Sequence, residues 1–132
     1  MIFIDSNIPM YLIGADHPNK HRAQELVERA IEAQERLVTD AEVFQEILHR
    51  YDAIGRREAI KPAFDLLLRI ADEVFAIDLL DLQRTRDILI GTNGLSARDS
   101  LHAAVMERHG VQRIMSFDGG YDQIAGIARL HR

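Results

Sequence analysis

Four short apolar segments alternate with longer helical segments along this chain, and this alternation restricts its fold more than any other feature. The apolar segments are residues 2–4, 37–38, 74–77 and 114–117. Strands that alternate with helices form parallel sheets, and strands that are apolar throughout are buried on both faces. The sequence therefore predicts an α/β fold of three layers, in which helices cover both faces of a mostly parallel sheet of four or five strands.

The segments between the predicted strands have the spacing of amphipathic helices. We expect helices over residues 8–13, 18–35, 41–54, 56–71, 79–90 and 96–110, and a weak edge strand over 128–130. In the second helix Ala23, Leu26, Val27, Ala30 and Ile31 follow helical periodicity and predict one core-facing stripe. No repeat or linker interrupts the series, so residues 1–132 are predicted to form one domain.

The composition excludes some classes of protein and leaves others open. Cysteine is absent, which excludes disulfides and thiolate metal sites. The net charge of −5 argues against a protein that holds nucleic acid by bulk electrostatics, but not against an enzyme whose acids gather at a metal site. No apolar run approaches the roughly 18 residues of a membrane span, and no signal peptide is recognisable. We therefore expect no membrane association and a cytoplasmic location.

Acidic residues stand where the predicted strands end. Asp5, Asp78 and Asp118 each follow an apolar segment directly, and Asp40 closes the short segment that begins at Leu37. Right-handed crossovers bring the carboxyl ends of parallel strands to one edge of the sheet, where α/β proteins bind ligands. These acids are therefore candidates for a site. A helix cap is the structural alternative, and for Asp78 it is the preferred interpretation.

Two predicted helices carry further acids with competing interpretations. Glu42 and Glu46 lie one turn apart and share a face, but Glu42 also fits a capping box at the start of its helix. Asp99 lies in the first turn after Ser96, where a capping role and the helix dipole favour an acid. Glu46 lies beyond the first turn, so its structural alternatives are a solvated face or an ion pair with Arg50.

A cluster of these acids would predict a metal site. Gathered carboxylates repel one another, and a divalent cation relieves that repulsion. Ligands that are all oxygen favour Mg²⁺ or Mn²⁺ over Zn²⁺. Such an ion can activate water and neutralise charge on a phosphoryl group, whereas the glycine-rich loops of nucleotide-binding proteins are absent here.

Four segments of the chain, taken in order, carry a resemblance to a known family. They are Ile2-Phe3-Ile4-Asp5-Ser6-Asn7, residues 39–48 with Glu46, residues 96–104 (SARDSLHAA), and residues 114–122 (IMSFDGGYD). Their order and spacing are similar to those of the PIN-domain ribonucleases, and among these to the VapC-type toxins of prokaryotic toxin–antitoxin pairs. The third segment, similar to the family pattern s-x-x-D-a-l-h-a-A, is the most specific match. The resemblance implies a PIN-like fold and a metal-dependent endoribonuclease that hydrolyses RNA phosphodiester bonds.

The resemblance also assigns residues to the site. It implies that Asp5, Glu46, Asp99 and Asp118 bind Mg²⁺ or Mn²⁺ and are catalytic. Three residues are assigned supporting roles: Asn7 and Ser116 near the acids, and Glu42 as the rival of Glu46. Arg50, Arg86 and Arg98 are weaker candidates for contacts with RNA. His102 is assigned to the structural pattern of its helix rather than to the site.

The same resemblance implies partners and leaves alternatives open. A VapC-type protein is expected to form a homodimer and to be inhibited by a small VapB-type antitoxin. A PIN-like binding module without catalysis, or a PIN nuclease without an antitoxin, are alternatives. A phosphatase of the haloacid dehalogenase type also begins with an apolar strand and Asp, but it needs a second Asp where this chain has Asn7.

Overall fold

A five-stranded parallel sheet forms the centre of the computed structural model, which describes residues 1–132. Its strands are β1 (Ile2–Ile4), β2 (Leu37–Asp40), β3 (Glu73–Phe75), β4 (Arg113–Met115) and β5 (Ala128–Leu130). They lie in the order β3-β2-β1-β4-β5, and each neighbouring pair is parallel. The predicted fold class is confirmed, and the weak edge strand at the end of the chain is the fifth strand.

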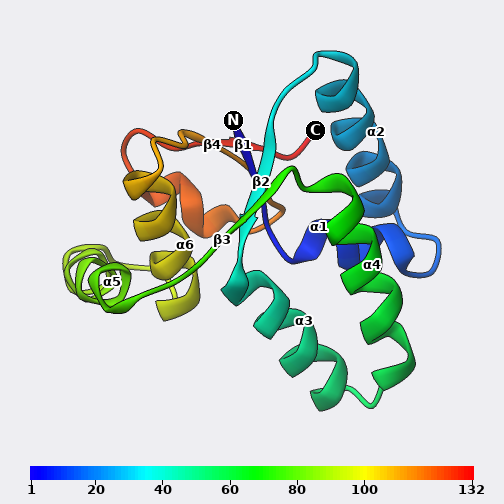
Figure 1. Cartoon of the computed structure of the whole chain (residues 1–132), viewed down its shortest axis with the longest axis horizontal. Helices are drawn as coiled ribbons and strands as arrows, with labels where there is room; N and C mark the ends of the chain where they lie inside the picture. Colours follow the sequence, from blue (N-terminus) through cyan, green and yellow to red (C-terminus); the bar gives the residue numbers. More distant parts are fainter.

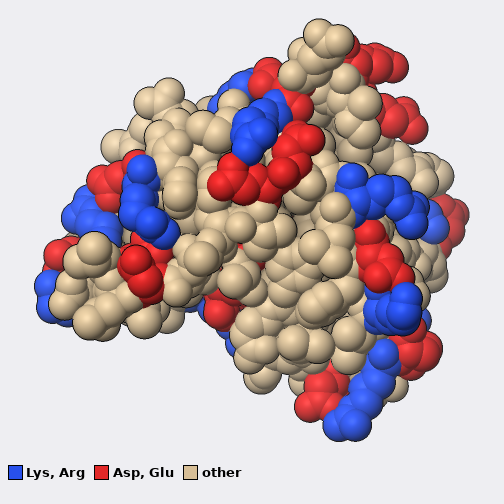
Figure 2. Space-filling model, in the orientation of Figure 1, with Lys and Arg blue, Asp and Glu red and all other residues tan.

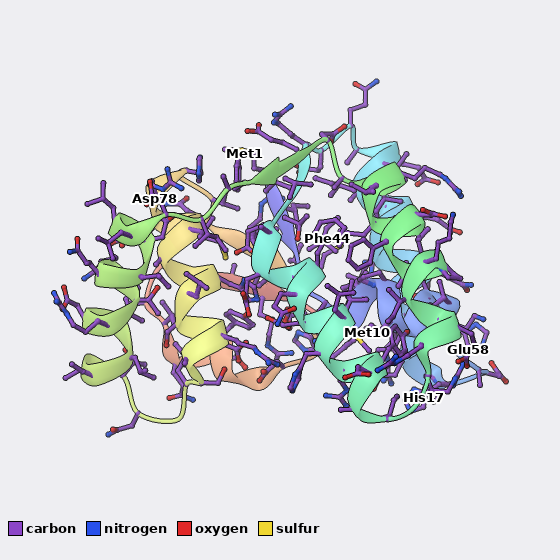
Figure 3. All side chains as sticks on the ribbon, turned by 60° about the horizontal axis from the view of Figure 1, so that its bottom comes forward. Met1, Met10, His17, Phe44, Glu58 and Asp78 are labelled. Carbon is purple, nitrogen blue, oxygen red and sulfur yellow. The ribbon has the colours of Figure 1, made fainter.

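Helices cover both faces of this sheet. The helices are α1 (Asn7–Ile13), α2 (Pro18–Glu32), α3 (Ala41–Ala53), α4 (Ile60–Ile70), α5 (Leu79–Gly91) and α6 (Ala97–Arg108), with short 3₁₀ helices η1 (Arg57–Ala59) and η2 (Gly119–Gln123). Figure 1 shows α5 and α6 on one side of the sheet and α1 to α4 on the other. The rotated view in Figure 3 shows the same division. These are the three layers that the sequence predicts.

Some predicted boundaries differ from those of the structure. The helix expected over 18–35 ends at Glu32, because Gln34 adopts a left-handed conformation (φ 55°) and the amide of Glu35 returns to the carbonyl of Ala30 at 3.0 Å. This arrangement satisfies a free carbonyl of the last turn and reverses the chain into β2. The helix expected over 56–71 is divided into η1 and α4.

The core lies on both faces of the central strands. Ile2, Phe3 and Ile4 of β1 are all buried, as expected for a strand with a neighbour on each side. On the side of the sheet covered by α1 to α4, α3 packs on α4 through Phe44 and Phe64, whose ring centroids are 4.9 Å apart. Figure 3 shows Phe44 between the two helices. Ile31 was predicted to face the core but is 56% exposed. Its neighbour Ala30 is buried, so the buried stripe of α2 is narrower in the last turn than the periodicity predicts.

The sheet register determines where the site forms. Phe3 of β1 is paired with Val38 of β2 on one side and with Ile114 of β4 on the other. The chain therefore leaves β1 at Asp5 between the carboxyl ends of β2 and β4. No helix of the structure has the length and apolar character that crossing a membrane requires.

Adjacent leucines of α4 allow a matched test of this packing. Leu67 is fully buried, whereas Leu68 is 57% exposed. We expect Leu67→Ala to lower the free energy of unfolding by about 2–5 kcal/mol, because it leaves a cavity in the core. The same change at Leu68 should cost about 0.5 kcal/mol or less. Urea unfolding of the two variants measures the difference, and equal losses would contradict the assignment of the inward face.

Candidate functional site

Asp5 lies buried at the end of β1 and is held by its neighbours. Its Oδ2 accepts a hydrogen bond from Ser116 Oγ at 2.5 Å and a longer one from Asn7 Nδ2 at 3.4 Å, and its Oδ1 accepts the amide of Ser6 at 2.8 Å. Asn7 in turn accepts the amide of Phe117 at 3.2 Å. Asn7 and Ser116, which the sequence assigns to supporting positions, therefore contact Asp5 directly. Burial raises the pKa of Asp5, although His102 and the bond from Ser116 oppose this rise.

Glu46 reaches the same place from the second turn of α3. Ser6 Oγ donates to Glu46 Oε2 at 2.7 Å, and His102 Nε2 lies 2.5 Å from Glu46 Oε1. Ligand atoms of Asp5, Glu46 and His102 all lie within 4.8 Å of one another. The ion pair with Arg50 that the sequence allowed is absent, since Glu46 is directed toward β1 instead. Burial alone would raise the pKa of Glu46, but the hydrogen bonds and charge of His102 together with Ser6 lower it.

The rival acid Glu42 occupies a different position. It does not line the cleft that holds Asp5 and Glu46, and its carboxylate lies 3.7 Å from Arg98. The predicted capping box at the start of α3 is wrong, because Asp40 caps this helix by accepting the amide of Val43 at 3.0 Å. The Thr39 hydroxyl, which such a box would use, donates to the backbone of β1 instead. The geometry favours Glu46 over Glu42 as the site residue.

Asp99 and Asp118 lie next to each other in the same cleft. Ser96 caps α6 through the amide of Asp99 at 3.1 Å, as predicted, but the Asp99 side chain accepts a bond from Tyr121 Oη at 3.0 Å. Burial, the adjacent Asp118 side chain and the charge of Asp5 raise the pKa of Asp99 to about 7. The bond to Asp99 lowers the pKa of Asp118. This pair therefore shares a proton near neutral pH when nothing else compensates its charge.

One cleft of about 620 Å³ is lined by all four predicted acids, Asp5, Glu46, Asp99 and Asp118. Only Asp5 and Glu46 belong to the cluster within 4.8 Å. Of the basic candidates, Arg50 and Arg98 line the cleft, whereas Arg86 lies on α5 outside it and pairs with Asp87. Figure 2 shows acidic and basic side chains interleaved on the face that it presents, with no continuous patch of one sign.

The sequence did not reveal the part that His102 and Asp40 play. The imidazole of His102 is fully buried, and its Nδ1 lies 2.7 Å from Asp40 Oδ2. Burial would lower the pKa of His102, but the carboxylates of Asp40 and Glu46 raise it well above its usual value. One signal was available: His102 follows Asp99 by three residues, which places both on the same face of a helix.

The donor set of the cleft fits a hard divalent cation. Its carboxylates supply oxygen ligands, and none of the four acids forms an ion pair with Lys or Arg. Burial raises the pKa values of Asp5 and Asp99, and a bound cation would favour their charged forms. An acidic cluster of this kind could hold a metal ion.

The fold and cleft together define a class: a parallel α/β protein with clustered carboxylates at the carboxyl edge of its sheet. Comparison with known families agrees, since the PIN domain model matches residues 2–127. The chain is 58% identical to Ribonuclease VapC13 of Mycobacterium tuberculosis over 98% of this chain and 99% of that one. It is 42% identical to Ribonuclease VapC23 of the same species, over 89% of this chain and 93% of the other. The chain therefore belongs to the PIN-domain family and, within it, to the VapC branch.

Solved structures confirm the fold at lower identity. VapC20 of Mycobacterium tuberculosis, described as a Sarcin-Ricin loop cleaving toxin, superposes with a TM-score of 0.80 at 20% identity, and the match covers 100% of both chains. A chain of VapBC2 from Rickettsia felis, solved with a promoter DNA fragment, gives 0.72 at 15% identity over 98% of this chain and 97% of that one. At these identities the likeness establishes the three-layer architecture alone.

The raised pKa of Asp99 predicts how stability depends on pH. A carboxyl whose pKa rises to about 7 on folding stabilises the fold fully below its unfolded pKa, and that contribution is lost as the pH rises through about 7. We expect thermal unfolding in EDTA to show falling stability between about pH 4 and pH 7 in the native chain. Asp99→Asn should flatten this slope, because the amide cannot ionise. An unchanged slope in the variant would contradict the assignment.

Proposed function

We propose that this protein is a metal-dependent endoribonuclease and the toxin of a VapBC-type toxin–antitoxin pair. The observation that carries the proposal is the joint presence of Asp5, Glu46, Asp99 and Asp118 in one cleft of a chain that is 58% identical to a VapC ribonuclease. The complete acid set speaks against a PIN-like module that only binds. The substrate is RNA, cleaved within the chain at a phosphodiester bond.

The four acids are proposed to hold Mg²⁺ or Mn²⁺. When bound, the ion would activate water as a Lewis acid and neutralise charge on the phosphoryl group. Asp5 would offer its oxygens from the end of β1, Glu46 from α3, Asp99 from α6 and Asp118 from the start of η2. Asn7, Ser116 and the Ser6 amide hold Asp5 in place through the hydrogen bonds described above. No side-chain nucleophile is needed for hydrolysis.

Two arginines at the cleft are proposed to contact the RNA backbone. Arg50 lines the cleft and forms no ion pair, so its guanidinium is available for a phosphate. Arg98 also lines the cleft, and its 3.7 Å contact with Glu42 is long enough to be exchanged for a phosphate oxygen. Contacts between an arginine guanidinium and a phosphate, which can be bidentate, position a nucleic acid without reading its sequence. Arg86, which points away from the cleft, is not included.

Cleavage of total RNA tests this proposal. The native chain should cleave RNA with Mg²⁺ or Mn²⁺ and lose this activity in EDTA. Asp5→Asn and Glu46→Gln should each reduce the rate by about 100-fold or more, because each removes a metal ligand and several kcal/mol of charge stabilisation. Mapping the cut ends by primer extension identifies the target.

Matched acid variants control this experiment. Asp65→Asn changes an exposed acid of α4 that pairs with Lys61, and Glu42→Gln changes the acid one turn before Glu46. Both should keep activity within about threefold of the native chain, a difference of less than one kcal/mol. Cleavage that persists in EDTA would contradict the proposed metal dependence, and cleavage that survives Asp5→Asn would contradict the assignment of Asp5 to the site.

The proposed partners are a VapB-type antitoxin and a second copy of the chain. A chain described as a toxin–antitoxin complex from Klebsiella pneumoniae has the same fold, with a TM-score of 0.68 at 14% identity over 97% of this chain and 96% of that one. The surface supports association, because several large apolar side chains are exposed: Leu48, Ile54 and Leu68 on or near α3 and α4, and Leu79, Leu80, Leu82 and Ile90 on α5. Three of the four on α5, Leu79, Leu80 and Leu82, lie in its first four residues, and this end of the helix is the proposed contact surface.

Light scattering on the purified chain measures its oligomeric state. We expect the mass of two chains, about 30 kDa from the 15.0 kDa of one. Leu79→Ser together with Ile90→Ser should leave the fold intact, because both side chains are more than 65% exposed. A dimer that survives this pair of changes would place its interface elsewhere on the surface, and a monomeric native chain would remove the homodimer from the proposal.

A further inference from the structure

A buried chain of side chains leads from the start of α3 to the metal-binding acids. Asp40 Oδ2 lies 2.7 Å from His102 Nδ1, and His102 Nε2 lies 2.5 Å from Glu46 Oε1. The side chains of Asp40 and His102 are both fully buried, and that of Glu46 is 12% exposed. Both ring nitrogens therefore face carboxylate oxygens.

Glu46 needs such support more than the other acids do. Asp5, Asp99 and Asp118 have short side chains that start at the end of a strand or in the first turn of a helix. Glu46 extends from the second turn of α3, and a free glutamate side chain loses about 1.5–2 kcal/mol of conformational freedom when it is fixed. In this chain Ser6 Oγ contacts Oε2 and His102 Nε2 contacts Oε1, so both carboxylate oxygens are held from opposite sides.

The ring that holds Glu46 is itself fixed. Asp40 caps α3 with its Oδ1 and contacts His102 with its Oδ2, so one carboxylate locks both the start of the helix and the imidazole. Phe3 of β1 packs against the ring, with centroids 5.3 Å apart. His102 comes from α6, so this contact joins three elements that meet only in the folded chain.

We propose that His102 is a positioning residue: held by Asp40, it fixes the carboxylate of Glu46 beside Asp5 and so preforms the metal site. The inference rests on the proposed function, since it concerns the ion which that function requires. If His102 served only to satisfy the buried carboxylate of Asp40, its Nε2 would not need to contact Glu46. Groups that orient a metal-binding side chain in this way typically contribute about 10–100-fold to metal affinity.

Two amide substitutions separate the two contacts of the ring. In His102→Asn the amide nitrogen can replace Nδ1 and serve Asp40, but it does not extend to Glu46. In His102→Gln the amide nitrogen can replace Nε2 and donate to Glu46. Mn²⁺ binding to each full chain is measured by the electron paramagnetic resonance of free Mn²⁺. We expect His102→Asn to weaken binding by about 10–100-fold and His102→Gln to recover most of the loss.

A control variant tests whether destabilising α6 is by itself enough to weaken Mn²⁺ binding. Ser100 is fully buried in the same helix, and its Oγ donates to the carbonyl of Ser96 at 2.8 Å without touching any acid of the cleft. Ser100→Ala should lower the unfolding temperature in EDTA but leave Mn²⁺ affinity within about threefold of the native value. The unfolding temperatures of the two His102 variants are measured alongside.

A measurement on the native chain covers the case in which the His102 variants do not fold. Side-chain ¹⁵N spectra of its histidines should show that the Nε2–H of His102 stays hydrogen-bonded and shifts when Mg²⁺ is added. A resonance that does not respond to Mg²⁺ would overturn the proposal, as would native Mn²⁺ affinity in His102→Asn. A native chain that binds no Mn²⁺ at all would instead overturn the metal site of the proposed function, and this inference with it.

Discussion

The burial of several carboxylates at one edge of the sheet is the constraint on which the rest of this structure depends. Asp5 is almost fully buried, and Asp99 is buried next to Asp118. Burying unpaired negative charge is costly, and the cost appears as the raised pKa values of Asp5 and Asp99. Parallel strands bring these acids together at one edge of the sheet. A single divalent ion bound there can neutralise the charge of several carboxylates.

Polar groups from several elements orient the acids of the cleft. Ser116, Asn7 and the Ser6 amide hold Asp5 on the floor of the cleft. Tyr121 contacts Asp99 from η2, and His102 contacts Glu46 from α6. Each carboxylate thus keeps a defined orientation although it repels the others. In the proposed metal site, this arrangement would reduce the entropy cost of binding the ion.

The charge distribution explains how a chain with a net charge of −5 can act on RNA. Under the proposed function, a cation bound by the acids would offset the negative charge of the cleft, so that the cleft would no longer repel a phosphate. Arg50 and Arg98 line the same cleft and are proposed to contact the RNA backbone there. Attraction is local and requires the ion, so overall net charge is a poor guide to the substrate of such an enzyme.

The sequence by itself determined the order of strands and helices, because apolar runs and helical periodicity are local properties. The family resemblance of its motifs assigned Asp5, Glu46, Asp99 and Asp118 to one site, and the structure places all four in one cleft. Boundaries such as the end of α2 at Glu32 depended on a left-handed residue that periodicity does not reveal.

Only the tertiary structure decided which groups touch the acids. Glu42 and Glu46 share one helical face in the sequence, yet Glu46 alone enters the cleft, since the direction of α3 relative to β1 is fixed by packing. Asp40 and His102 are 62 residues apart and come together through the sheet order and the crossover to α6. Contacts between distant segments arise from the arrangement of whole elements, and that information is not present in any local pattern of residues.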